Sequence, residues 1–408
     1  MTEAISLPAD AEALRKAKAN VVRLAAAGAF AGANSTVIIA TASIAGSMFA
    51  SDPAYATVPI SVFVVGSAIA TLPQGWVARH KGRRVAFMIG TGCGALAGLT
   101  GSLAMYRGSF LLLCVATFLA GLYQAVAASY RFAATDGAPA HFRPKAISWV
   151  MAGGVFAAFL GPQLVQWTMN IWQPYLFAAS YLAQAVIAII AMIVLWGVDL
   201  PKPTAASLKA GRPLMEIVSK PGFITAALCG VVAYGLMNLV MTSAPLAMKM
   251  CGLTLEDSNL GIQWHVLAMF GPSFFTGSLI ARFGAKQIVA VGMVLLALAA
   301  VVGLAGLTVW HFWVGLVLLG VGWNFGFVGA SAMVVETHRP EERNKVQAFN
   351  DFVVFGIMAA GSFSSGHLLS AAGWDAVNHV VFPPVVVALA ALYLGWRRDR
   401  RTVEARVV

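Results

Sequence analysis

Residues 75–84 read Gly-Trp-Val-Ala-Arg-His-Lys-Gly-Arg-Arg, and the rest of the chain can be placed outward from this stretch. Apolar runs at 57–78 and 85–105 flank its basic part. Each run is long enough to cross a hydrocarbon core of roughly 30 Å as a helix. Residues 79–84 between them hold four Lys or Arg and one His. Because short basic loops stay on the cytoplasmic side, this hairpin predicts the orientation of both neighbouring helices.

The composition is that of a polytopic helical membrane protein. Hydrophobic residues make up 59% of the 408 and charged residues 11%, with a mean hydropathy of +0.79. Soluble proteins carry about 25% charged residues. The net charge of +11 would suit a nucleic-acid partner, but of the 27 Lys and Arg only Arg107 and Lys249 fall outside the predicted cytoplasmic side. This asymmetry is typical of membrane topology and excludes a nucleic-acid groove.

Twelve apolar spans can be placed along the chain, and both termini then lie in the cytoplasm. The four cysteines show no metal-ligand spacing, and no phosphate-binding Gly-Lys-Ser/Thr loop occurs, so we predict neither a metal site, a cofactor nor an enzyme. The predicted spans are 21–46, 57–78, 85–105, 109–130, 146–169, 174–196, 222–246, 259–281, 288–309, 312–335, 347–371 and 380–396.

The one substantial break between spans is a polar, proline-containing stretch near the middle of the chain. It is too short to fold as a domain and predicts a linker between two helical bundles. The predicted organisation is a cytoplasmic segment 1–20, a bundle 21–196, a cytoplasmic linker 197–221, a second bundle 222–396 and a basic cytoplasmic tail 397–408.

Residues 75–84 resemble the loop signature Gly-x-x-x-Asp-Arg-x-Gly-Arg-Arg of the major facilitator superfamily. Arg79 stands where the family has Asp, and the family glycines and arginines recur at Gly75, Gly82, Arg83 and Arg84. The resemblance implies an all-α integral membrane protein with twelve transmembrane helices in two pseudo-symmetric six-helix bundles. It also implies a secondary transporter that works by alternating access.

A second, weaker copy of this signature lies at residues 277–286. A shift of 202 residues places its Gly277 on Gly75 and its Gly284 on Gly82. The repeat agrees with two parallel halves of the kind found in this superfamily. The resemblance further implies that the first, fourth, seventh and tenth helices line a central cavity.

Aromatic and amide side chains on these helices are the candidates for substrate binding. A shift of 200 residues places Trp323-Asn324 on Tyr123-Gln124. Aromatic rings and neutral amides suit a flat, largely uncharged molecule. The alternative is that they only bridge packed helices. The predicted substrate-binding residues are Asn34, Tyr123, Gln124, Tyr234, Asn238, Gln263, Trp323 and Asn324.

Few ionisable groups are available to carry a proton within the spans. His265 is one candidate, because the unperturbed pKa of His lies near working pH. The alternative is a neutral, hydrogen-bonded histidine inside the bundle. Asp351 near the start of the eleventh span is the other candidate, although capping of the helix by its dipole would also explain an acid there.

Asp351 also suggests a gate. In the superfamily the acid of the loop signature meets the start of the eleventh helix. Because Arg79 replaces that acid here, we predict a reversed pair between Arg79 and Asp351. Glu341 and Glu342 are rival partners for Arg79, and topology alone is the alternative role for the basic loop. The predicted gating residues are Gly75, Arg79, Gly82, Arg83 and Asp351.

The expected function is secondary active transport of a small, flat, largely uncharged organic molecule across the inner membrane by a monomer, with a proton as a candidate coupling ion. Runs at 262–284, 322–325 and 349–352 are similar to a proteobacterial branch of permeases that includes riboflavin-transporter-like proteins, which favours riboflavin-like uptake. Proton-coupled export of a hydrophobic drug or siderophore is the alternative. A receptor without transport is disfavoured by the duplicated halves.

Overall fold

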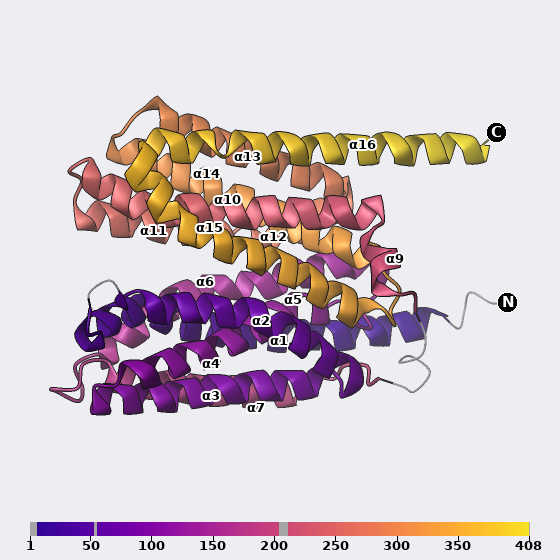
Figure 1. The fold of residues 1–408 in the computed structure, drawn as a ribbon. Coiled ribbons are helices and arrows are strands. Elements are labelled where there is room, and N and C mark those ends of the chain that lie inside the picture. The colour runs from indigo at the N-terminus through magenta and orange to yellow at the C-terminus, as the bar shows by residue number, and fades with distance from the viewer. Residues whose placement is uncertain (1–5, 53–54, 204–210, 408) are drawn as a thin grey trace. The chain divides into compact units, whose positions relative to one another are not determined.

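All regular secondary structure in the described part of the chain is helical. The computed structural model describes residues 6–52, 55–203 and 211–407, and no strand occurs in those ranges (Figure 1). The chain divides into two compact units. The first is Met1–Gly211 with Pro340–Gly356, and the second is Arg212–Arg339 with Ile357–Val408. The beginning of the eleventh predicted span therefore packs with the first half of the chain.

The helices follow the predicted spans, with short turns added between them. The first unit contains α1 (Ser6–Phe49), α2 (Val58–His80), α3 (Arg83–Arg107), α4 (Phe110–Ala128), α5 (Tyr130–Ala133), the 3-10 turn η2 (Ala140–Phe142), α6 (Arg143–Thr168) and α7 (Ala178–Trp196). The second contains α9 (Leu214–Val218), α10 (Pro221–Met250), α11 (Leu255–Phe270), α12 (Ser273–Phe283), α13 (Ala285–Ala305), α14 (Val309–Glu336) and α16 (Phe382–Val407), while α15 (Arg343–His379) begins in the first unit and ends in the second.

Ten helices in the described residues are long and apolar enough to cross a membrane. The pair Glu256–Phe270 and Ser273–Phe283, bent by 40°, adds an eleventh span. These eleven correspond to eleven of the twelve predicted spans. The remaining prediction, 347–371, lies within α15, where the side chains of 362–367 and 370 fall outside the described residues.

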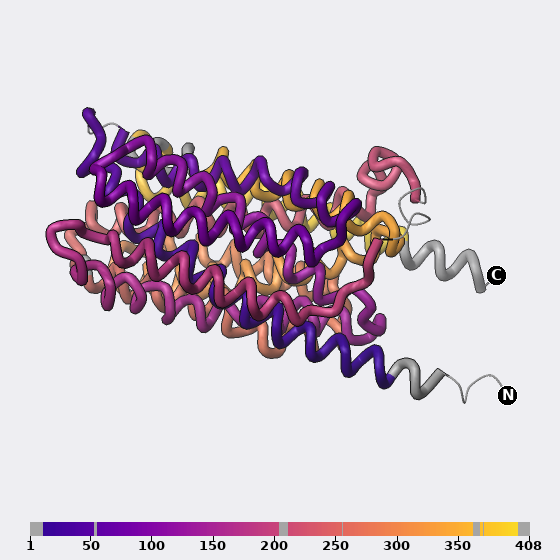
Figure 2. The backbone as a smooth tube through the Cα atoms, turned by 90° about the horizontal axis from the view of Figure 1, so that it is seen from below, coloured from indigo at the N-terminus to yellow at the C-terminus, as the bar shows by residue number. Residues whose placement is uncertain are grey.

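The first helix is longer than the predicted span. It begins at Ser6 rather than near residue 21, and no break separates residues 6–20 from the rest of the helix. Its early part is rich in alanine, the strongest helix former, and Lys16 pairs with Glu12 one turn earlier at 2.9 Å. Figure 2 shows this part of α1, in indigo, running on past the neighbouring helices of the first unit.

The repeated signature has the same backbone geometry in both halves. Gly82 precedes α3 with φ 95° and ψ 155°, and Gly284 precedes α13 with φ 92° and ψ 151°. This region of φ and ψ is essentially restricted to glycine. The two glycines that the repeat aligned therefore make the same sharp turn between consecutive spans.

Within each unit the helices approach closely at small residues. In the first unit α1 packs on α6, α2 on α4, and α3 on α4 and α7; in the second, α14 packs on α10, α11 and α13. A Cβ atom on Gly98 of α3 would lie 2.4 Å from the backbone nitrogen of Ala185 in α7. Small side chains of this kind let transmembrane helices pack backbone to backbone.

Candidate functional site

The first unit holds a cluster of buried ionisable side chains. Arg83, Arg131, Asp136 and Asp351 have side chains that are only 2–5% exposed. Removing charges from water is costly unless each finds a close partner of opposite sign. In a chain with so few charged residues, four buried charges at one end of a unit mark a candidate functional site.

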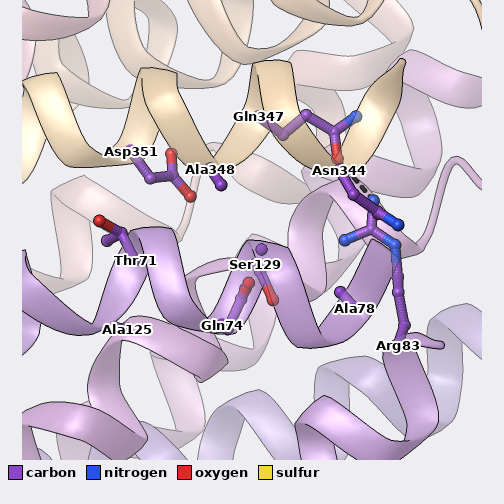
Figure 3. A pocket seen from close by; sticks show the side chains of 11 residues that line it. Thr71, Gln74, Ala78, Arg83, Ala125, Ser129, Asn344, Gln347, Ala348 and Asp351 are labelled. Atoms are coloured by element: carbon purple, nitrogen blue, oxygen red, sulfur yellow. Dashed lines mark hydrogen bonds between the residues drawn. The ribbon is translucent and has the colours of Figure 1, made fainter. Parts of the chain in front are cut away.

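Arg83 is the first anchor of this cluster. The turn at Gly82 starts α3 with Arg83, whose Nε donates to Oδ2 of Asp136 at 2.6 Å. Its Nη2 donates to Oε1 of Gln347 at 2.5 Å, and Figure 3 shows this bond reaching from α3 to α15. Arg83 thus joins three segments that are far apart in the sequence.

Asp351 is paired with Arg131. Nη2 of Arg131 lies 2.5 Å from Oδ1 of Asp351, and Asn350 donates to the same oxygen at 3.1 Å. Arg131 lies on the short helix α5, donates to the carbonyl of Ala128, and has its guanidinium 4.3 Å from the centre of the Phe132 ring. These contacts hold the guanidinium toward α15.

This pairing corrects two predictions about Asp351. The partner is Arg131 and not Arg79, because the turn after α4 brings the Arg131 guanidinium to α15. Capping is also excluded, because α15 begins at Arg343 and Asp351 follows more than two turns later. The helix dipole acts within the first turn only.

A third arginine completes the cluster. Nη1 of Arg343 lies 3.5 Å from Oδ1 of Asp136, so that one carboxylate faces both Arg343 and Arg83. Arg131, Asp136 and Arg343 were not among the predicted site residues. The available signal was an acid and an arginine five residues apart directly after an aromatic-rich span, in a chain where acids are scarce.

Gly75, a predicted gating residue, lies where α2 meets α15. A Cβ atom on Gly75 would be 2.2 Å from Cβ of Ala348 and 3.2 Å from the carbonyl oxygen of Asn344. Beside this contact is a cavity of about 10 Å³, room for a single water. Figure 3 shows its lining, which is Thr71, Gln74, Gly75, Ala78, Arg83, Ala125, Ser129, Asn344, Gln347, Ala348 and Asp351.

Two predicted substrate contacts in the first unit have packing roles. Nδ2 of Asn34 donates to the carbonyl of Gln184 at 3.2 Å, and Nε2 of Gln184 returns a bond to Oδ1 of Asn34 at 2.8 Å. The Tyr123 ring is 1% exposed and fills the space above Gly94, where an added Cβ would lie 2.4 Å from it. Asn34 thus joins α1 to α7 and Tyr123 joins α4 to α3, and their contact with a ligand stays a prediction.

Gln124 is placed differently. It is half-buried, and its Oε1 accepts a bond of 2.6 Å from the Ser35 hydroxyl of α1. This bond joins α4 to α1.

Asn324 in the second unit is fully used in packing. Its Nδ2 donates to the carbonyl of Met269 and to the Ser273 hydroxyl, both at 2.6 Å, and its Oδ1 accepts from Thr276 at 2.7 Å. These bonds fasten both arms of the bent α11–α12 pair to α14. Asn324 thus bridges helices, and its contact with a substrate stays a prediction.

An aromatic cluster lies beside it. Trp323 is 1% exposed, stacks on Phe327 at 5.3 Å, and meets the edges of Phe270 at 5.5 Å and Tyr234 at 5.6 Å. Trp323 is thus the buried centre of the cluster, and its contact with a ligand stays a prediction. Tyr234 is half-buried at its margin.

Asn238 and Gln263 complete the predicted set. Asn238 lies one turn after Tyr234 on the same face of α10 and is half-buried. Its Nδ2 has no hydrogen-bond partner among the described residues. Gln263 is exposed on α11.

His265 is fully buried on α11. Its Nδ1 lies 2.7 Å from the carbonyl oxygen of Leu316, which can only accept, so Nδ1 carries the hydrogen. Nε2 is then an acceptor without a partner among the described residues. The ring is held in one tautomer with one nitrogen unused.

The fold and these packed, repeated halves define a transporter of the major facilitator type. The profile of the Major Facilitator Superfamily matches residues 24–273 and 261–407, and the chain belongs to this family. It is a multi-pass membrane transporter and not an enzyme.

Among proteins of known sequence, the chain is 46% identical over 400 residues to the riboflavin transporter RfnT of Brucella anthropi. The match covers 97% of this chain and 100% of that protein. The chain is also 30% identical over 343 residues to the MFS-type transporter YddS of Bacillus subtilis, covering 78% of each.

Solved structures show the same fold at low sequence identity. The proton:xylose symporter XylE matches with a TM-score of 0.78 at 14% identity, covering 94% of this chain and 96% of that one. FucP in its outward conformation matches with a TM-score of 0.73 at 13% identity, covering 92% and 97%. At these low sequence identities the structural similarity supports the fold assignment only.

Proposed function

We propose that this transporter imports riboflavin or a closely similar flat heterocycle. The observation that carries the proposal is the 46% identity to a riboflavin transporter along nearly the whole of both chains. A planar ring system with polar edges binds well to aromatic faces and amide groups, because stacking and a few hydrogen bonds together orient it.

Tyr234 and Asn238 are the proposed substrate contacts in the second unit. They share one face of α10, and the Asn238 amide nitrogen has no partner in the described chain. Tyr234 rests edge-on against Trp323 and against Phe327 at 4.9 Å, which fixes its ring orientation. In the first unit, Gln124 is a further proposed contact through its side-chain amide. Gln263 is a further proposed contact.

The buried charges of the first unit form the proposed gate. Arg83 and Arg131 tie the start of α15 to α3 and α5 through Gln347 and Asp351. In the transport cycle this segment separates from the rest of the first unit and then returns. Gly75 allows α2 to approach α15 closely, and the turn at Gly82 orients Arg83 at the start of α3. Arg79, in the last turn of α2 just before Gly82, is a further proposed gating residue.

A proton is the proposed coupling ion. His265 offers an unused ring nitrogen in a fully buried place, and Asp351 offers a carboxylate that is uncovered when it leaves Arg131. Proton binding at either group changes a buried charge, which biases one conformation over another.

The proposed location is the inner membrane, with both termini in the cytoplasm and the protein acting as a monomer. The concentration of Lys and Arg at one end of the predicted spans supports this orientation.

Uptake of radiolabelled riboflavin into right-side-out vesicles tests the function. We expect accumulation that unlabelled riboflavin competes away, and at least a tenfold loss in Asn238→Ala and Tyr234→Ala. Gln166→Ala, an exposed amide on α6, is the matched control. Accumulation only in inverted vesicles would indicate export, and binding without accumulation would indicate a receptor.

A further inference from the structure

A second cavity in the first unit lies beside the charge cluster and outside the proposed substrate contacts. It has a volume of about 240 Å³. The end of α2, the start of α3, the linker and the start of α15 all contribute to its wall. Its polar lining consists of Arg79, Arg83, Lys202, Arg343, Asn344 and one acid, Glu341.

The linker wall of this cavity is fixed in place. The Asn20 side chain donates to the carbonyl of Asp199 at 2.6 Å and accepts from the backbone nitrogen of Asp199 at 3.0 Å. Farther along, Cδ of Pro203 lies 3.3 Å from where a Cβ on Gly82 would be. Lys202 lies between these two contacts and is therefore held beside the cavity.

Positive charge is crowded on the opposite wall. Arg83 and Arg343 share the single carboxylate of Asp136, at 2.6 Å and 3.5 Å. Burial, together with the nearby charge of Arg83, lowers the pKa of Arg343 despite the attraction of Asp136. An anion in the cavity would offset this repulsion.

We propose that this cavity binds a phosphate group. Guanidinium groups donate paired N–H bonds that match phosphate oxygens, and a lysine ammonium adds a point charge from another direction. The volume is below the roughly 300–1,000 Å³ of sites for drug-sized ligands, so it suits one phosphate-bearing group. The phosphate comes from a soluble phosphate monoester or from the headgroup of an anionic lipid.

Thermal unfolding of the full-length protein tests the proposal. The protein is held in phosphatidylcholine nanodiscs and titrated with inorganic phosphate against chloride at equal ionic strength. In parallel, it is placed in nanodiscs that contain phosphatidic acid. We expect Tm to rise by about 3 °C at ten times the dissociation constant. A rise with inorganic phosphate identifies a soluble ligand, and a rise only with phosphatidic acid identifies a lipid headgroup.

Lys202→Gln and Lys81→Gln are the matched variants. Both remove one exposed lysine at this end of the unit, but only Lys202 lines the cavity. We expect Lys202→Gln to raise the ligand concentration needed for half of the Tm shift at least threefold, and Lys81→Gln to leave it unchanged. Without ligand, both variants should unfold at the wild-type Tm. Equal effects of the two variants, or no rise in Tm with either phosphate source, would overturn the proposal.

Discussion

Arg131 and Asp351, 220 residues apart in the sequence, meet at 2.5 Å with side chains only 2% and 5% exposed. One partner lies on a four-residue helix after α4 and the other lies beyond the second turn of α15. A buried charge pair of this kind holds its two helices in one register, because separating the helices would leave both charges buried without a partner.

Breaking this pair should be costly. Asp351→Asn leaves the Arg131 guanidinium buried without its counterion, and we expect a loss of about 3–5 kcal/mol in unfolding free energy. Riboflavin uptake should fall at least tenfold. Asp375→Asn removes an exposed acid from the same helix and should leave both unchanged.

The double variant Arg131→Gln with Asp351→Asn separates pairing from simple loss of charge. It removes both buried charges together, so its unfolding free energy should fall by less than the sum of the two single losses. Additive losses would mean that the two side chains do not interact.

Gly75→Ala should obstruct the contact between α2 and α15. The added methyl would lie 2.2 Å from Cβ of Ala348, and we expect a loss of about 1–3 kcal/mol from overpacking, with reduced uptake. Ala348→Gly in the same chain should restore both, because it removes the opposing carbon. Gly361→Ala is the control. Gly361 lies on α15, as Ala348 does, and a Cβ atom added there meets no atom within 4 Å.

Gly82→Ala and Gly284→Ala should destabilise the protein to a similar extent. Both glycines have φ above 90° and ψ above 150°, and a side chain there costs about 1–3 kcal/mol. Thermal unfolding compares them with Gly222→Ala, whose added carbon meets no atom within 4 Å. Full tolerance of alanine at both turns would contradict the shared strained geometry.

Replacement of His265 tests the proposed coupling of transport to a proton. His265→Phe removes the imidazole of His265 and its bond to the Leu316 carbonyl, and we expect uptake to lose its dependence on external pH. His379→Phe, at an exposed position on α15, should keep that dependence. An unaltered pH profile in His265→Phe would assign the histidine to packing alone.

Several features of the fold were predictable from particular residues. The spans followed from hydropathy, because a lipid-exposed backbone must satisfy its hydrogen bonds within each helix. Gly82 and Gly284 were aligned by the repeat and adopt nearly the same dihedral angles. The early start of α1 was missed, because the polar segment was read by hydropathy, while its alanines favour a helix.

The site was less predictable. Tyr123 and Trp323 were chosen by depth and residue type, but each is buried against a neighbouring helix. The rotation of a helix about its own axis is not visible in an apolar sequence, because every face of the helix is apolar. The bridging roles of Asn34 and Asn324 were hidden for a related reason, since an amide that bridges helices looks the same in the sequence as one that binds a ligand.

By itself, the sequence determined the membrane class, eleven of the spans and the duplicated turn, since these follow from local hydropathy and from residues within one loop. Only the tertiary structure decided that Asp351 pairs with Arg131, that Asp136 serves two arginines, and that Lys202 lies beside them. Those arrangements depend on which helix faces meet, and packing sets that choice through contacts between residues far apart in the chain.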